Sequence, residues 1–455
     1  MPVEPSPEEP SHTPGSDIAG EQAMGWALFI ISALLILSLL TSYILRRRKV
    51  TVIQEGFVSI AAGMLVGLAL RLQPGTEVQN MMNFDADIFF NVLLPPIILS
   101  SGYQLHKADF FINLVPIAVF AFIGTFISAM VIGVLLYAFV ITGVDSLPIS
   151  LLDCFIVGSV LSATDPVTVL AVIKQMKVEP RLDAIVSGES LLNDAVAIVL
   201  FTTLRMFRGQ DFQLAVVGSG VLIFLNVLFS SLAIGIGFAL LSALLFKYTD
   251  MHLFPSIESC LVLIVAYSSY FFSNGLGKSG IVSLLFCGMT MRHYVTPSLS
   301  HHSKITINEV FEIMSRISEN FIFVDLGLTL FTDSELIFRP IFIIIAAVIV
   351  VISRAAAIFP LSKLMNSIHR KSVEQHKKLV PMSYQMLLLW AGLRGAVAVA
   401  LAAQAHHSPA DGSKPDEKNP GPYIRAMVLG VVVITVVVFG GTTRWLINHA
   451  GIRTG

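Results

Sequence analysis

Long apolar runs separated by short polar segments dominate this sequence and constrain its fold more than any other feature. Of its 455 residues, 55% are hydrophobic and only 13% are charged, about half the charge of an ordinary soluble domain. Folding in water would require a core too large for a chain of this length, whereas a bilayer accommodates about 20 apolar residues in each helical crossing. The sequence therefore predicts an all-α polytopic membrane protein.

The apolar stretches predict about thirteen crossings, numbered in chain order. They cover approximately residues 24–45, 54–72, 86–103, 111–140, 151–173, 182–204, 212–246, 256–273, 279–293, 305–331, 338–365, 381–405 and 423–447. This number divides into six crossings, one long linking crossing at 212–246, and six more. The two six-crossing units then run in opposite senses, an inverted repeat that is typical of secondary transporters.

Lys and Arg are distributed unequally between the two sides of the predicted membrane. About 18 lie in loops on one side and about 8 on the other, and the richer side is cytosolic by the positive-inside rule. An odd number of crossings then places the C-terminus in the cytosol and the N-terminus in a lumen or outside. Residues 1–23 are rich in Pro, Glu and Ser and lack a basic segment, so they are predicted to form a disordered luminal arm.

Crossing 5 contains a polar interruption near its middle, in the sequence SVLSATDPVTVLAVI. Pro166 donates no backbone hydrogen bond and disfavours α geometry at Asp165, so the helix should open around Thr164 and Asp165. Backbone carbonyls freed by such an opening can coordinate a cation where they line a wet cavity.

Crossing 6 contains a polar stripe near its middle. Ser190 and Asp194 are four residues apart, as are Glu189 and Asn193. Residues at this spacing stack on one helical face, so these four side chains should lie together. Ionisable groups inside a membrane are costly and are usually functional, although a buried pair that only orders packing is the structural alternative.

Two midplane carboxylates, Asp165 and Asp194, predict a site at which a proton and a small hard cation compete. Oxygen ligands suit an alkali ion, and partial desolvation makes a carboxylate bind a proton more readily. Asp194 is the predicted exchanging group. Because Asn193 is neutral, the site has one carboxylate fewer than an Asp-Asp pair, which favours electroneutral exchange of one proton for one monovalent cation.

Crossing 12 also carries a charge, Arg394, between two glycines in LLLWAGLRGAVAVAL. Crossings 5 and 12 occupy the same place in each six-crossing unit, and helix-weakening residues at both centres indicate a binding site. Arg394 keeps its proton and needs an anion. Glu189 is the predicted partner in a structural ion pair, which leaves Asp165 and Asp194 for the ion.

Several long motifs resemble those of the cation/proton antiporter superfamily, in particular the Na⁺(K⁺)/H⁺ exchangers of endosomal and vacuolar membranes and their fungal endosomal members. The resemblance covers essentially Trp26 to Gly455. The motifs are FFNVLLPPIILSSGY (89–103), LSATDPVTVLAV (161–172), GESLLNDAVAIV (188–199), IESCLVLIVAYSSYFFSNG (257–275), SGIVSLLFCGMTMRHY (279–294), SENFIF (318–323), WAGLRGAVAVAL (390–401) and FGGTTR (439–444).

The resemblance implies a homodimer that works by an elevator-like motion. A dimerisation part would cover about 24–103 and 212–331, and a mobile ion-transporting core about 111–204 and 338–447. Such exchangers move luminal protons out in exchange for cytosolic Na⁺ or K⁺, driven by a proton-pumping ATPase. The implied location is an endosomal, late endosomal or vacuolar membrane, with membrane lipids as partners.

The resemblance also assigns the site residue by residue. The family's ion-site positions fall on Asp194, Asn193, Ser190, Thr164 and Asp165, of which Asp194, Asp165, Ser190 and Thr164 would hold the monovalent cation. Its Glu-Arg pair falls on Glu189 and Arg394. Further charges within crossings are predicted as accessory residues, namely Glu319, Arg354 as a structural residue paired with a core acid, and Asp325, where similar exchangers have an uncharged residue.

Two other functions remain open from the sequence alone. A cation channel predicts flux without proton coupling. An intramembrane aspartyl protease would use Asp165 and Asp194 as a dyad, but the YD, GxGD and PAL motifs of such enzymes are absent from the sequence. The sequence therefore favours a transporter that is not an enzyme and has no cofactor, and the formal net charge of −1 lacks the basic excess of a nucleic-acid binder.

Overall fold

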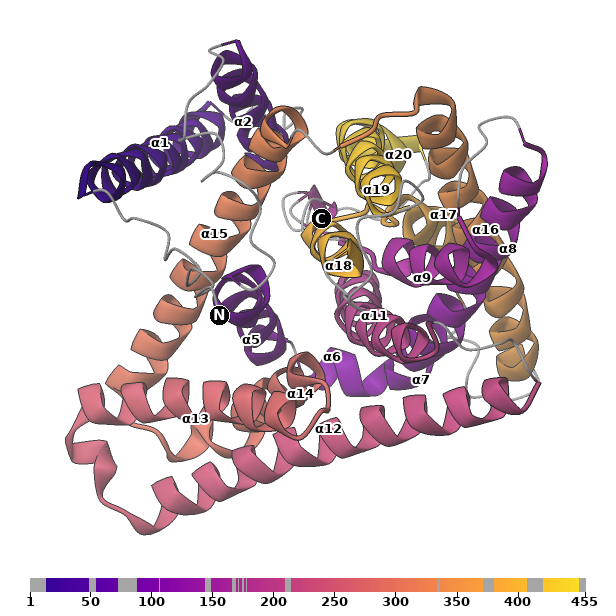
Figure 1. Cartoon of the computed structure of the whole chain (residues 1–455). Helices are drawn as coiled ribbons and strands as arrows, with labels where there is room; N and C mark the ends of the chain where they lie inside the picture. Colours follow the sequence, from indigo (N-terminus) through magenta and orange to yellow (C-terminus); the bar gives the residue numbers. More distant parts are fainter. Residues whose placement is uncertain are drawn as a thin grey trace, which may run out of the picture.

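The computed structural model is built of helices and connecting turns (Figure 1). It describes residues 14–48, 55–72, 88–105, 107–143, 149–165, 169–170, 172–173, 176, 178–208, 214–333, 336–370, 380–406 and 420–449. No β-strand occurs among these residues, which confirms the predicted all-α fold.

One group of helices lies mainly along the left and the bottom of Figure 1, and we call these the frame helices. It comprises α1 (Pro14–Arg47), α2 (Glu55–Arg71), α5 (Leu94–Gln104) with the π-helical turn η1 (Phe89–Leu93) before it, α12 (Leu214–Tyr248), α13 (Pro255–Gly275), α14 (Gly280–Tyr294) and α15 (His301–Thr332). Glycines allow these helices to approach closely: Gly63 of α2 meets Gly327 of α15, and Gly235 of α12 meets the Ser283 backbone of α14. Backbone contact of this kind joins helices tightly in a membrane, where apolar side chains gain nothing by leaving the lipid.

The second group, called the crossing bundle, packs around α11 (Pro180–Met206) (Figure 1). Its other helices are α6 (Lys107–Ile112), α7 (Leu114–Ala118), η2 (Val119–Gly124), α8 (Thr125–Ile141), α9 (Leu151–Ser162), α16 (Pro340–Arg370), α17 (Met382–Trp390), α18 (Ala396–His406), α19 (Gly421–Thr435), η6 (Val436–Gly440) and α20 (Gly441–His449). The most apolar part of α11 is 89% buried, whereas that of α1 is 17% buried. Protein therefore surrounds α11, and most of α1 is left for lipid to cover.

Seven helices of the described chain are long and apolar enough to cross a membrane. They are Met24–Leu45, Leu114–Ile141, Pro180–Met206, Gly218–Tyr248, Pro255–Gly275, Pro340–Ser367 and Gly421–His449. Six predicted crossings do not meet this criterion, namely 54–72, 86–103, 151–173, 279–293, 305–331 and 381–405. Two of these six have broken helices, as the sequence predicted: α9 ends at Ser162, and α17 and α18 are separated by 391–395. The exact number of thirteen stays a prediction.

Two further predictions about long segments have different outcomes. The linking crossing predicted at 212–246 is one continuous helix, α12. The prediction of a disordered arm over 1–23 is wrong for residues 14–23, which form the beginning of α1. Residues 1–13 lie outside the described part of the chain.

Candidate ion-binding site

Two broken helices meet in the middle of the crossing bundle. After α9 ends, Ala163–Asp165 are not helical, and 391–395 between α17 and α18 are not helical either. The two openings touch, because the Asp165 backbone N–H donates to the Leu393 carbonyl over 2.9 Å. Gly395 allows the two openings to approach closely. A Cβ at this position would collide with the Asp165 side chain, so only glycine permits the approach.

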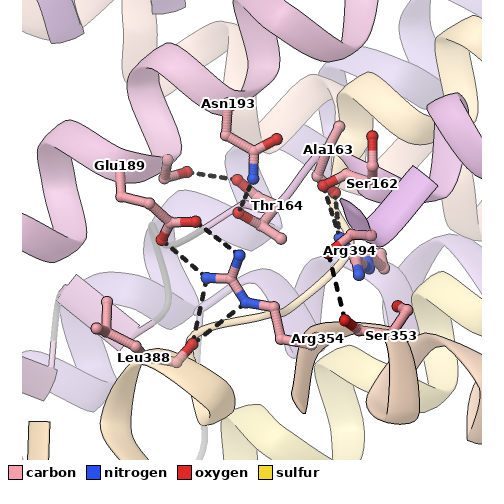
Figure 2. Close-up of polar contacts among 11 residues, drawn as sticks. Ser162, Ala163, Thr164, Glu189, Asn193, Ser353, Arg354, Leu388 and Arg394 are labelled. Atoms are coloured by element: carbon pink, nitrogen blue, oxygen red, sulfur yellow. Dashed lines mark hydrogen bonds and ion pairs between the residues drawn. The ribbon is translucent and has the colours of Figure 1, made fainter. Parts of the chain in front are cut away.

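Arg394 lies fully buried where the two openings meet, with 0% of its surface exposed. Its Nη1 donates to the carbonyl oxygens of Ser162 and Ala163, each over 2.9 Å (Figure 2). These carbonyls are at the C-terminal end of α9, where backbone acceptors lack helical partners and the helix dipole favours a cation. Its backbone N–H donates to Thr435 Oγ1 over 3.3 Å, which ties the opening to α19. Arg394 therefore replaces the hydrogen bonds that the break removes from α9.

The partner predicted for Glu189 is wrong. Glu189 forms a bidentate ion pair with Arg354 of α16, at 2.6 Å from Nη1 to Oε1 and 2.8 Å from Nη2 to Oε2 (Figure 2). Arg354 also donates from Nε and Nη2 to the Leu388 carbonyl, over 3.3 and 3.2 Å. The physical reason is that the α9 carbonyls already hold Arg394, while α16 offers Arg354 in the orientation that suits two parallel charge-assisted bonds.

The polar stripe predicted on α11 faces the opening after α9. Ser190 Oγ donates to the Thr164 carbonyl, and Asn193 Nδ2 donates to Thr164 Oγ1 over 3.0 Å. Asn193 Oδ1 and Asp194 Oδ1 are buried and accept no hydrogen bond from the described residues. Asp194 also interacts electrostatically with Asp165. The structure thus brings all five predicted ion-site residues together.

The atoms of this site that could coordinate a cation are all oxygens, from carboxylate, amide, hydroxyl and backbone carbonyl groups. Such hard ligands suit alkali and alkaline-earth cations and protons better than transition metals. In the described part of the chain, no group of three or more His, Cys, Asp or Glu residues could hold a metal ion. An unpaired carboxylate oxygen in a buried site is costly, and a bound cation or proton removes this cost.

The accessory residues have different positions. Glu319 and Asp325 both lie on α15, a frame helix, and Ser315 Oγ donates to Glu319 over 2.9 Å. Arg354, predicted to pair with a core acid, is the partner of Glu189 and thus belongs to the site. Sequence reasoning missed Thr435 and the Leu388 carbonyl, because a hydroxyl or a backbone group within an apolar run carries no signal of its own.

Comparison with known proteins shows the family to which this chain belongs. A family model described as "Sodium/hydrogen exchanger, transmembrane" matches residues 34–449. An uncharacterised Na⁺/H⁺ antiporter of Schizosaccharomyces pombe is 48% identical over 430 residues, which cover 94% of this chain and 74% of that protein. The endosomal/prevacuolar sodium/hydrogen exchanger of Saccharomyces cerevisiae is 46% identical over 475 residues, with coverage of 99% and 73%. Sodium/hydrogen exchanger 9 of Homo sapiens is 39% identical over 390 residues, with coverage of 84% and 58%.

Among solved structures, the sodium proton antiporter MjNhaP1 of Methanocaldococcus jannaschii at pH 8 has the same fold. The TM-score is 0.70 at 18% sequence identity, over 93% of this chain and 98% of that one. The family matched is one of transporters and not of enzymes. The buried oxygen site between two broken helices, the fold and the family match over most of the sequence agree, and the chain belongs to the sodium/hydrogen exchanger family.

Proposed function

We propose that this protein exchanges luminal protons for cytosolic monovalent cations, Na⁺ or K⁺, by secondary active antiport. The observation that carries the proposal is Asp194, whose Oδ1 is buried beside the helix break with no hydrogen-bond donor among the described residues. A proton and a cation would occupy this carboxylate in turn. The exchange activity in the names of the relatives supports the same function.

The cation would be held by Asp194, Asp165, Ser190 and Thr164, with Asn193 orienting Thr164. The hydrogen bond from Asn193 Nδ2 fixes the Thr164 hydroxyl, and Ser190 fixes its carbonyl, so neither group has to reorganise when the ion arrives. Arg394 would stabilise the end of α9, and the ion pair of Glu189 would maintain the bundle around it. Such support from surrounding residues keeps first-contact ligands in place.

The exchange would be electroneutral, one proton for one monovalent cation. Only the Asp194 carboxylate would exchange its bound ion, because the neighbouring side chain, Asn193, is a neutral amide. One positive charge would therefore be carried in each direction. A transport rate that does not respond to an imposed membrane potential in liposomes is expected. A rate that rises or falls with the potential would contradict this stoichiometry.

Alternating access would follow from an elevator-like motion within a homodimer. The crossing bundle, about 111–204 and 338–447, would move as the core, while 24–103 and 212–331 would form the dimerisation part. Two observations support this division: all five ion-site residues lie on the crossing bundle, and close glycine contacts hold several frame helices together.

The protein would work in an endosomal, late endosomal or vacuolar membrane, with its N-terminus in the lumen and its C-terminus in the cytosol. The name of the yeast relative supports this location. A proton-pumping ATPase would supply the luminal protons, membrane lipids would surround the exposed apolar faces, and no cofactor would be needed.

The proposal is tested by exchange in proteoliposomes that contain a pH-sensitive dye. Wild-type protein should move protons when Na⁺, K⁺ or Li⁺ is added, and the order of the three rates gives the selectivity. Asp194→Asn should abolish the exchange, because an amide takes up no proton. Asp250→Asn, at an exposed position after α12, is the control and should exchange like wild type. Cation-dependent proton movement that survives Asp194→Asn would refute the assigned centre, and cation flux without proton movement would indicate a channel.

A further inference from the structure

An ion pair joins the two groups of helices. Arg425, in the first turns of α19, pairs with Asp333, which directly follows α15. Both side chains are nearly buried, with 11% and 7% of their surface exposed. Because α19 belongs to the crossing bundle and α15 to the frame helices, this pair fixes one group against the other.

A small cavity lies beside this pair, between α15 and the helices α18 and α19. Its lining residues are Thr329, Val399, Ala402, Ala403, Arg425 and Leu429. Thr329 Oγ1 is buried and has no hydrogen-bond partner within the described chain. The interface between the groups is therefore imperfectly filled and partly polar at this point, unlike the close glycine contacts within the frame.

Polar side chains follow the same side of α15 from the pair toward the middle of the helix. Asp325, Thr329 and Asp333 are spaced four residues apart, a spacing that stacks them on one helical side. At a rise of 1.5 Å per residue, Asp325 lies about 12 Å deeper than Asp333. Thr329 lines the cavity with α18 and α19, and the helical spacing places Asp325 on the same side of α15.

We propose that the Arg425–Asp333 pair is a gate that closes the luminal path to the ion site and breaks in each transport cycle. This inference rests on the proposed exchange and its orientation, in which α15 ends and α19 begins at the luminal face. Movement of the crossing bundle along the frame separates Arg425 from Asp333 and opens the polar line behind them. When the bundle returns, the pair re-forms and excludes luminal water.

A cross-linking experiment tests the gate. Asp333→Cys and Arg425→Cys are combined in a chain whose three native cysteines are replaced by Ala, and a short bifunctional methanethiosulfonate reagent joins the two thiols. Cation-dependent proton movement in proteoliposomes should fall to background after cross-linking. Dithiothreitol should restore it, because the reduced protein can separate the two helices again.

An ion pair within the crossing bundle provides the matched control. Arg208 Nη2 lies 2.9 Å from Asp153 Oδ1, and Arg208 Nη1 donates to the carbonyl of Ala405 near the end of α18, so this pair lies near the same end of the bundle. Asp153→Cys with Arg208→Cys should cross-link equally well. Exchange should persist, because both residues move together.

The outcomes separate the gate from the exchange itself. Full exchange by the protein cross-linked between positions 333 and 425, with the link confirmed by mass spectrometry, would overturn the gate and leave the proposed function intact. Absence of exchange in the wild-type protein would instead reject the proposed function, and the gate with it.

Charge reversal gives a second test without cysteines. Asp333→Arg places two cations together and should lower the exchange rate severalfold, and Arg425→Asp should do the same with two anions. Combining both changes restores an ion pair of opposite polarity and should recover most of the rate. Single reversals that exchange like wild type would contradict the gate, as would a double reversal with no recovery.

Discussion

Glu189 and Arg354 form the most buried ion pair in the described part of the chain, with 2% and 6% of their side-chain surfaces exposed. Taking two charges out of water is costly, and excellent geometry with further hydrogen bonds is needed to offset that cost. The two parallel bonds and the Leu388 carbonyl provide both. At this position the pair joins α11, α16 and α17, the helices around the ion site.

Removal of one partner should therefore be severe. We expect Arg354→Ala to destabilise the protein by about 3–5 kcal/mol, because it leaves the Glu189 carboxylate buried and unpaired. The melting temperature in detergent micelles measures the effect. The matched control is Arg316→Ala, which removes an exposed helical pair with Glu312 and should cost about 0.3–0.5 kcal/mol. Equal losses in the two variants would show that the buried pair contributes no special stability.

The sequence alone does not determine which arginine pairs with Glu189. Arg354 and Arg394 both lie within apolar crossings, and their chemistry is identical. Which of them meets Glu189 depends on where the bundle places α16 relative to α11, and no local pattern encodes that placement. The stripe of Ser190, Asn193 and Asp194 was predictable, because residues on one helix are placed relative to each other by helical geometry alone.

At the scale of elements, the site depends on two helices that stop in the middle of the bundle. Pro166 made the opening after Ser162 predictable, since the residue before a proline avoids α geometry. The opening between α17 and α18 contains no proline, and its glycines indicated only a weak helix. The direct contact between the two openings could not be predicted from the sequence. In this contact, the Asp165 backbone N–H donates to the Leu393 carbonyl.

Gly395→Ala tests that contact. A methyl group at this position collides with the Asp165 side chain, so the two openings must separate and displace the ligands of the ion. We expect exchange to be lost while the protein remains folded and monodisperse in detergent. Gly237→Ala, within α12 where a Cβ meets nothing within 4 Å, is the control and should leave exchange intact. Normal exchange by Gly395→Ala would show that close approach of the openings is dispensable.

At the scale of the whole molecule, composition was sufficient to predict a helical membrane protein. The boundaries of individual helices were harder to predict from the sequence. Polar residues on α15 lower its hydropathy although it is one continuous helix of 32 residues, and α1 begins within a segment that composition marked as disordered.

The predicted topology has a direct test. An odd number of crossings places the two termini on opposite sides of the membrane. Epitope tags at each end of the full chain, treated with protease in sealed vesicles, should show one tag cleaved and the other protected. Detergent should then expose both tags equally. Cleavage or protection of both tags in sealed vesicles would require an even number of crossings.

Arg394 has a consequence for the valence of the transported ion. Its guanidinium donates to two backbone carbonyls and interacts electrostatically with the Asp194 carboxylate, so its positive charge belongs to the site, while Glu189 and Arg354 form their own ion pair. With Asp165 and Asp194 ionised, the formal charge of the cluster is minus one. A monovalent cation or a single proton brings it to neutrality, whereas Ca²⁺ or Mg²⁺ would leave an excess positive charge in a buried site, where an uncompensated charge is costly. We therefore expect the arginine that caps the broken helix also to disfavour divalent ions.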